Sequence, residues 1–141
     1  MIKTGTEILA DIQVYPNFWK IVDWIALHKY IIEVCYTSGF HPVQDENGRH
    51  KFSHHQYGNN PFSFTLFQLL AESHVIVTTF PERDMLFLNI WSCSREPEAF
   101  LTAFLNDIEI IDIHYRRCAR MDLKEMQSIE KHKQLSGTEN S

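Results

Sequence analysis

The sequence has 141 residues, of which 44% are hydrophobic and 22% charged, with a formal net charge of -5. This length suits one domain with a core that needs no disulfides or metals, and the negative charge argues against nucleic acid, which clustered Lys and Arg would bind. No apolar stretch is long enough to cross a membrane, and the N-terminus lacks the apolar segment of a secretory signal. The three widely spaced cysteines favour a reducing cytoplasm over a disulfide framework.

The first part of the chain predicts a strand followed by a helix. Residues 6–14 (TEILADIQV) are short and apolar enough for a strand, which the next proline and asparagine would end. Apolar residues recur at helical spacing over residues 18–35, with Asn17 as an N-cap and Gly39 closing the C-terminus. Residues 41–61 are rich in His, Asn and Gly, which favours loops around one or two short strands.

The rest of the chain predicts more strands and one further helix. The strands are expected at residues 62–70, 75–79, 85–91 and 108–115, and the helix near residues 96–106. This order predicts an α+β fold, a two-layer α/β sandwich with helices on one face of an antiparallel sheet. We expect a single domain over residues 1–121 and a polar tail, residues 122–141, that starts as a helix and becomes disordered.

A polar triplet interrupts an apolar run in the middle of the chain. The run reads LLAESHVIVTTFPE over residues 69–82, and the triplet is Glu72, Ser73 and His74. All three side chains can take part in acid–base or nucleophilic chemistry. Their position just before a predicted strand raises the question of function.

The predicted hairpin after the triplet brings a thiol near the serine. If Thr79 lies opposite Met85, then Ser73 lies opposite Trp91. Cys93 would share a sheet face with Ser73, at a distance of roughly 7 to 8 Å. Spacing alone is consistent with a shared site, but it is equally consistent with a serine and a buried cysteine that have no function.

The same residues resemble the prokaryotic S-adenosylmethionine decarboxylase proenzymes. That family combines Glu-Ser-His, a strand, an aromatic-Pro-Glu turn and a distal cysteine, as residues 69–93 do here without a gap. The likeness extends more loosely to the first strand and the helix after it. It implies the same small sandwich, with two protomers that pair as a homodimer or higher oligomer and build active sites at their interface.

The resemblance implies a cofactor that the chain makes from itself. In the family, the serine matched by Ser73 attacks the carbonyl of the residue matched by Glu72, and the peptide bond becomes an ester. Elimination leaves dehydroalanine, which hydrolyses to a pyruvoyl group. This ketone forms a Schiff base with the substrate amine and accepts the electrons released with carbon dioxide.

The resemblance also assigns roles to other residues. Cys93 matches the proton donor, and Glu82 matches a turn glutamate that hydrogen-bonds the ribose of the substrate. Thr65 falls at the hydroxyl position that helps the acyl shift. Tyr57 is the counterpart of an aromatic residue that stacks on adenine. His74 either contacts the cleavage site or is a hydrogen-bonded strand histidine.

The main departure from the family is Thr78, which stands where the family carries a second histidine. A threonine hydroxyl is not a base near neutral pH, and a positioned acid or base contributes about 10²- to 10⁴-fold in rate, so processing is expected to be slow or absent. Three functions stay open. They are a decarboxylase of S-adenosylmethionine for spermidine and polyamine synthesis, a decarboxylase of arginine or ornithine with the same cofactor, and an unprocessed regulatory or binding subunit.

The histidines outside this motif do not predict a metal centre. His50, His54 and His55, with His41 nearby, lie in a segment that looks like a loop, and no cysteine or carboxylate pair completes a ligand set. We expect no metal and interpret these side chains as solvated.

Overall fold

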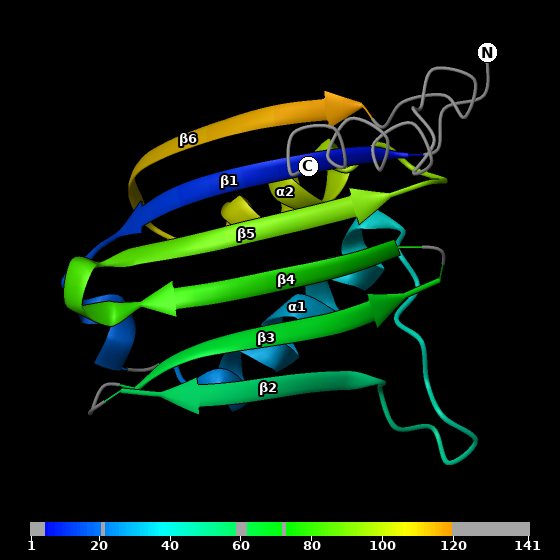
Figure 1. The fold of residues 1–141 in the computed structure, drawn as a ribbon, viewed down its shortest axis with the longest axis horizontal. Coiled ribbons are helices and arrows are strands. Elements are labelled where there is room, and N and C mark those ends of the chain that lie inside the picture. The colour runs from blue at the N-terminus through cyan, green and yellow to red at the C-terminus, as the bar shows by residue number, and fades with distance from the viewer. Residues whose placement is uncertain (1–4, 21, 59–61, 72, 120–141) are drawn as a thin grey trace, which may run out of the picture.

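A computed structural model describes residues 5–20, 22–58, 62–71 and 73–119 (Figure 1). Within them the strands are β1 (Thr6–Val14), β2 (Phe52–Tyr57), β3 (Ser63–Leu70), β4 (Ser73–Phe80), β5 (Met85–Ser92) and β6 (Ile110–Ala119). The helices are α1 (Trp24–Ser38) and α2 (Glu98–Asn106), with short 3₁₀ helices η1 (Pro16–Lys20) and η2 (Pro81–Arg83). Glu72 and the predicted tail, residues 122–141, lie outside the described residues.

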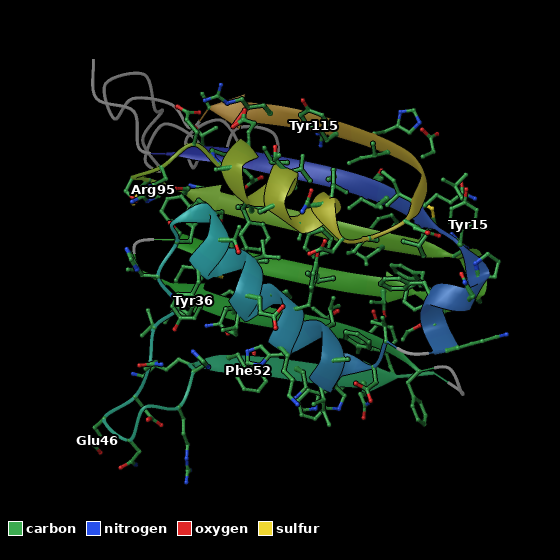
Figure 2. All side chains as sticks on the ribbon, turned by 180° about the vertical axis from the view of Figure 1, so that it is seen from behind. Tyr15, Tyr36, Glu46, Phe52, Arg95 and Tyr115 are labelled. Carbon is green, nitrogen blue, oxygen red and sulfur yellow. The ribbon has the colours of Figure 1, made fainter. Side chains whose placement is uncertain are left out.

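The strands form one antiparallel sheet in the order β2-β3-β4-β5-β1-β6. Both helices cover the same face of this sheet, as the views from its two sides show (Figures 1 and 2). The arrangement confirms the predicted α+β sandwich. No described helix is long and apolar enough to span a bilayer.

The core lies between the helices and the covered sheet face. Residues alternate between buried and more exposed along β1, β4 and β5, as expected when one face of a strand packs against helices. The helices add large apolar side chains, each worth about 1.5–3 kcal/mol when fully buried. The large, fully buried side chains of the core include Ile8, Ile12, Leu27, Ile31, Phe64, Leu66, Leu86, Leu88, Ile90, Phe100 and Phe104.

The start of the first helix differs from the prediction. The segment expected to begin a helix forms η1, and α1 starts only after Asp23, whose Oδ1 accepts a hydrogen bond from the Ala26 N–H at 2.8 Å. The predicted Asn17 cap is therefore wrong, because Asp23 satisfies the first turn instead. Gly39 does close the helix, with a φ of 83° that favours glycine.

The remaining elements lie close to their predicted positions. The strands expected at residues 62–70, 85–91 and 108–115 correspond to β3, β5 and β6, with shifts largest at β6. The segment 41–61 contains one strand, β2, which carries His54 and His55. These two histidines belong to a sheet edge and not to a loop.

The predicted pairing of β4 with β5 is wrong by one residue. Phe80 lies opposite Met85, and Ser73 lies opposite Ser92. The connection is shorter than expected because Asp84 caps η2 at its C-terminus, with a left-handed φ of 52° that aspartate tolerates. Asp84 Oδ1 also accepts a hydrogen bond from Trp19 Nε1 at 3.1 Å, which ties this turn to η1.

Candidate active site

Ser73 begins β4, immediately after the hairpin turn that follows β3. It pairs with Leu70 on β3 and with Ser92 on β5, and Ser92 pairs in turn with Thr6 on β1. The three hydroxyl residues are buried, with exposed fractions of 4% for Ser73, 2% for Ser92 and 9% for Thr6. The sheet therefore places a row of hydroxyl residues at one end of the core.

The Ser73 hydroxyl is buried and has no hydrogen-bond partner among the described residues. A buried hydroxyl without a partner costs about 1–3 kcal/mol, so its presence calls for an explanation. Ala71, in the adjoining turn, is exposed and donates its N–H to the His41 carbonyl at 2.9 Å. An unengaged nucleophile thus lies beside an exposed, anchored turn, which fits a serine that acts on its own chain.

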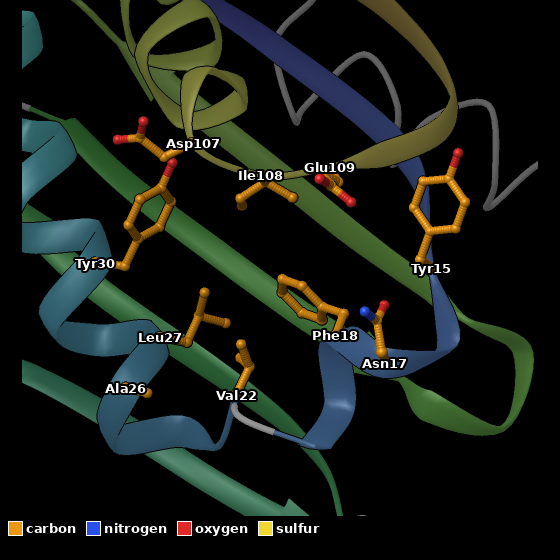
Figure 3. Close-up of a pocket in the computed structure, with 10 residues that line it drawn as sticks. All are labelled: Tyr15, Asn17, Phe18, Val22, Ala26, Leu27, Tyr30, Asp107, Ile108 and Glu109. Carbon is orange, nitrogen blue, oxygen red and sulfur yellow. The ribbon is translucent and has the colours of Figure 1, made fainter.

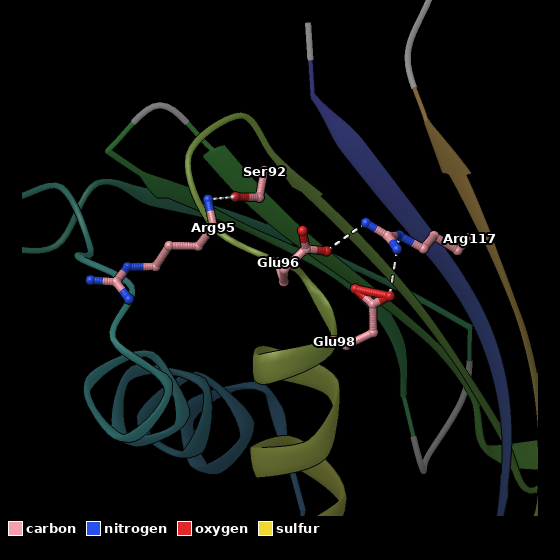
Figure 4. A network of polar contacts seen from close by, with 5 residues as sticks. All are labelled: Ser92, Arg95, Glu96, Glu98 and Arg117. Atoms are coloured by element: carbon pink, nitrogen blue, oxygen red, sulfur yellow. Dashed lines mark hydrogen bonds and ion pairs between the residues drawn. The ribbon is translucent and has the colours of Figure 1, made fainter. Parts of the chain in front are cut away.

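Cys93 directly follows Ser92, the residue opposite Ser73. The corrected register still brings residue 93 close to the start of β4, but the predicted sharing of one sheet face by Cys93 and Ser73 no longer follows, because neighbouring strand residues point to opposite faces. Ser92 Oγ accepts a hydrogen bond from the Arg95 N–H at 3.0 Å, which closes the turn containing Cys93 (Figure 4). Cys93 is exposed, so a substrate can reach it.

A group of charged residues joins this turn to β6. Arg117 Nη2 donates to Glu96 Oε2 at 2.5 Å, and Arg117 Nε lies 3.2 Å from Glu98 Oε2 (Figure 4). Exposed ion pairs contribute only about 0.2–1 kcal/mol each. Their main effect here is to fix the path of the chain between Ser92 and α2.

His74 lies on the open face of the sheet, away from the helices. Its ring stacks between Phe67, at a centroid distance of 5.6 Å, and Trp91, at 5.7 Å. Neighbouring residues on a strand point to opposite faces, so His74 and Ser73 project to different sides. Within this chain, His74 packs between aromatic rings.

The other predicted site residues gather at the opposite end of β4. Thr65 Oγ1 and Thr78 Oγ1 are 3.2 Å apart, and the Tyr57 hydroxyl lies 3.5 Å from Thr65 Oγ1. Close by in the fold, Ser63 Oγ donates to Glu82 Oε2 at 3.4 Å. We call Thr65, Thr78, Tyr57 and Glu82 the threonine group, and Ser73 with Cys93 the cleavage group.

The two groups are too far apart to act together within one chain. Thr78 lies five positions after Ser73 on an extended strand, which separates their Cα atoms by about 16 Å. Proton transfer requires a heavy-atom separation of about 3 Å. The sequence motif therefore contains two sets of residues that lie at opposite ends of the sheet.

Two polar residues that the sequence did not single out belong near these groups. Ser92 supports the Cys93 turn, and Asn89 lies on the open face beside a shallow hollow of about 260 Å³ that Asp11, Thr78 and Phe87 also line. The Asn89 Oδ1 atom is buried and has no hydrogen-bond partner among the described residues. Neither residue has a motif of its own, and only strand pairing reveals it.

The histidines near β2 pack against aromatic rings. His54 stacks on Trp24 and His28 stacks on Phe52, both with centroids 3.7 Å apart. His28 Nε2 is 2.7 Å from Gln68 Oε1, and burial lowers the pKa of His28 below 6.5. The described part of the chain contains no group of three or more His, Cys, Asp or Glu arranged to hold a metal ion.

Comparisons with known proteins agree with this fold and with the family that the sequence resembles. The family model described as S-adenosylmethionine decarboxylase matches residues 7–121. The proteins named S-adenosylmethionine decarboxylase proenzyme 2 from Bacillus cereus and from Bacillus anthracis are each 25% identical over 112 residues, which cover 75% of this chain and 91% of the relative. The crystal structure of the adenosylmethionine decarboxylase from Aquifex aeolicus VF5 has the same fold, with a TM-score of 0.67 at 19% identity over 91% of this chain and 99% of that one. The chain therefore belongs to the S-adenosylmethionine decarboxylase family.

Proposed function

We propose that this protein is a pyruvoyl-dependent S-adenosylmethionine decarboxylase proenzyme that cleaves itself between Glu72 and Ser73. Its product would serve spermidine and polyamine synthesis. The observation that carries the proposal is the buried Ser73 hydroxyl, which has no hydrogen-bond partner among the described residues and stands at the exit of the hairpin turn. Family membership supports the reaction class.

Self-cleavage begins at the serine. The Ser73 Oγ adds to the Glu72 carbonyl carbon, the C–N bond breaks, and the nitrogen takes up the hydroxyl proton, which leaves an ester. Loss of the Ser73 Cα proton then expels the Glu72 carboxylate and forms dehydroalanine. Water replaces the nitrogen, which leaves as ammonia, and residue 73 becomes a pyruvoyl group. Burial of Ser73 beside Ser92 favours this course, because it limits premature hydrolysis of the ester.

The residues around position 73 fit such a group. A pyruvoyl ketone supplies an acceptor for the electrons released with carbon dioxide. Ser92 and Thr6, in the same buried row, would hold it with their hydroxyl groups. Cys93, one residue beyond Ser92, would then deliver a proton to the substrate carbon. We place the reaction in the cytoplasm, since this exposed thiol must stay reduced.

We further propose that a second protomer completes the site. In a twofold dimer, each chain offers the same surface to its partner, so the threonine group of one protomer can meet the cleavage group of the other. This pairing would resolve the separation of about 16 Å between Ser73 and Thr78 in one chain.

The open face of the sheet is suited to such pairing, in which the partner would reach the backbone at the start of β4, because the Ser73 side chain projects to the covered face. No described helix covers the open face (Figure 1), and it exposes large apolar side chains, including Leu69 at 37% and Phe87 at 38%. Exposed apolar surface of this kind is typical of protein interfaces. The unpartnered Asn89 Oδ1 atom on the same face would find a donor in the partner or the substrate.

Coexpression of two defective chains tests the shared site. Thr65→Val and Ser73→Ala should each block cleavage when expressed alone. In heterodimers, Ser73 of the Thr65→Val chain would meet the intact Thr65 of its partner, so about half of the Thr65→Val chains should be cleaved at equal expression. Absence of rescue would show that Thr65 acts within its own chain. Normal cleavage of the Thr65→Val chain expressed alone would show that Thr65 has no role in self-cleavage.

The substrate is tested by carbon dioxide release from S-adenosylmethionine, arginine and ornithine. The proposal predicts release from S-adenosylmethionine only. Arginine and ornithine are the alternative substrates that the sequence left open. Release from arginine or ornithine, with none from S-adenosylmethionine, would overturn the first choice.

An unprocessed regulatory or binding subunit is the second candidate. Thr78 favours it, because both side chains of the Thr65–Thr78 pair are hydroxyls and neither is a base near neutral pH. This candidate predicts an intact chain without decarboxylase activity. The mass of the purified protein distinguishes it from the proenzyme.

A further inference from the structure

A second pocket lies on the helix side of the molecule, away from the cleavage group. It has a volume of about 570 Å³ and is enclosed by η1, the first turns of α1 and the connection from α2 to β6 (Figure 3). Tyr15, at its mouth, follows the end of β1, whereas Thr6, beside Ser92, begins that strand. The length of β1 separates these ends by about 26 Å.

The interior of the pocket is mainly apolar. Its volume falls within the range of about 300–1,000 Å³ that is typical of small-molecule sites. Leu27, which is buried, and Phe18 point into the space between the two walls (Figure 3). The apolar lining residues are Phe18, Val22, Ala26, Leu27 and Ile108, and the rings of Tyr15 and Tyr30 add to them. Such a lining favours a ligand with an apolar body.

The polar part of the lining carries negative charge. Asp107 and Glu109 stand on either side of Ile108 along the same wall (Figure 3). Both are exposed, and the ten described residues that line the pocket include no Lys or Arg. A positive ligand would therefore meet two carboxylates, whereas a negative ligand would be repelled.

A neighbouring cavity reinforces this charge. It measures about 600 Å³, lies between α1 and α2, and shares Tyr30 and Asp107 with the first pocket. Its lining adds Glu33 and Glu98 and again includes no Lys or Arg, although Glu98 is paired with Arg117. Asp107 is thus bordered by negative charge on both sides.

Tyr30 lines both cavities, and its side chain is a neutral phenol. Its hydroxyl donates to the Phe104 carbonyl at 2.5 Å. The pKa of Tyr30 is raised, first by burial and also by the negative charges of Asp107 and Glu33. The ring therefore offers an uncharged aromatic surface next to the Asp107 carboxylate, a combination suited to an ammonium group.

We propose that this pocket binds an organic amine cation with an apolar body, of the arylalkylammonium class. The ammonium group would lie near Asp107 and Glu109, and the body would cover Phe18 and Leu27. The site is independent of the decarboxylation chemistry, because it uses neither the cleavage group nor the threonine group.

Calorimetric titration with phenethylammonium tests the proposal. Its neutral analogue 2-phenylethanol has a similar apolar body, and phenylacetate reverses the charge. We expect phenethylammonium to bind at least about tenfold more tightly than the alcohol at low salt, to weaken as salt rises, and phenylacetate not to bind. Equal affinity for the amine and the alcohol would overturn the role of the carboxylates. Tighter binding of butane-1,4-diammonium would overturn the role of the apolar body.

Variants locate the binding. The double variant Asp107→Asn, Glu109→Gln should weaken binding of phenethylammonium at least about tenfold, and Ala26→Trp should block it by filling the pocket. Glu46→Gln removes a negative charge from an exposed loop outside the pocket and should leave the affinity unchanged. Undiminished binding by both pocket variants, each with a wild-type melting temperature, would overturn the site.

The same titration is repeated with Ser73→Ala. Because the pocket is independent of the cleavage group, this variant should bind phenethylammonium as the unmodified chain does. The two proposals are therefore tested separately. Loss of amine binding would not contradict self-cleavage, and an uncleaved chain would not contradict the amine site.

Discussion

Ser73 and Ser92 lie directly opposite each other where β4 begins and β5 ends, and both are buried. Ser92 Oγ accepts a hydrogen bond from the Arg95 N–H, whereas Ser73 Oγ has no partner among the described residues. The two hydroxyl groups therefore have different tasks. Ser92 holds the turn that carries Cys93, whereas the Ser73 hydroxyl is the nucleophile in the self-cleavage that we propose.

The first prediction concerns Ser92. Ser92→Ala removes the acceptor of the Arg95 N–H, and a hydrogen bond of this kind contributes about 0.5–1.5 kcal/mol. If that loss moves Cys93, kcat should fall roughly 2- to 10-fold with little change in KM, because the thiol acts after substrate binding. Steady-state kinetics measures both constants. Ser94→Ala, in the same exposed turn, should leave kcat unchanged, and an unchanged kcat for Ser92→Ala would separate Ser92 from the reaction.

The second prediction concerns Thr78. Thr78→His introduces an imidazole next to Thr65, within the threonine group that would act on the partner's chain. The elimination step should accelerate, with about 10²-fold as the lower end of the usual gain from a positioned base. Ile76→His puts the same ring two residues away on the same strand face and serves as the control. Equal cleavage rates in Thr78→His and the unmodified chain would mean that another group already supplies the base.

The third prediction concerns the cysteines. Burial raises the pKa of Cys35 to about 12, whereas Cys93 and Cys118 are exposed. Only the thiolate reacts with iodoacetamide, so at about pH 8 the native protein should be alkylated at Cys93 and Cys118 but not at Cys35. After cleavage, both labels should lie on the fragment that begins at residue 73. Mass spectrometry detects them, and labelling of Cys35 in the native state would contradict its burial.

The fourth prediction concerns acid stability. Burial, aided by nearby His50 and His54, lowers the pKa of His28 in the folded chain below its ordinary 6.5, despite the hydrogen bond to Gln68. As pH falls through 6.5, the unfolded chain binds a proton at this position before the folded chain does. The free energy of unfolding should therefore decrease on acidification below 6.5, and this contribution should be constant above it.

Urea unfolding at a series of pH values tests this account of His28. His28→Gln should flatten the decrease in stability below pH 6.5, since glutamine does not titrate. His41→Gln changes an exposed histidine and should retain the full decrease. Identical pH profiles for the two variants would rule out His28 as the source.

The sequence predicted those strands and helices whose own apolar residues determine how they pack. Short apolar runs identified β1 and the strands on both sides of the triplet, because one face of each strand packs in the core. The prediction failed where a single polar side chain sets the start of a helix or the length of a turn. Asp23 caps α1, which displaces the predicted Asn17, and the left-handed Asp84 shortens the β4–β5 connection, which moves the pairing by one residue.

The site was predicted in part for a similar reason. The family motif drew attention to Ser73, Cys93 and Thr65, but a linear motif does not tell which residues share one end of a sheet. Strand pairing places the threonine group far from Ser73 in the same chain. It also reveals Ser92 and Asn89, whose importance depends on partners distant in sequence.

Intact mass spectrometry of the purified protein is the most direct test of the central claim. Self-cleavage between Glu72 and Ser73 predicts two fragments, residues 1–72 and residues 73–141, with a blocked N-terminus on the second fragment. Ser73→Ala should remain one species of 16.6 kDa. A single species of 16.6 kDa from the unmodified chain, unchanged after days of incubation, would contradict a pyruvoyl enzyme and favour the unprocessed subunit.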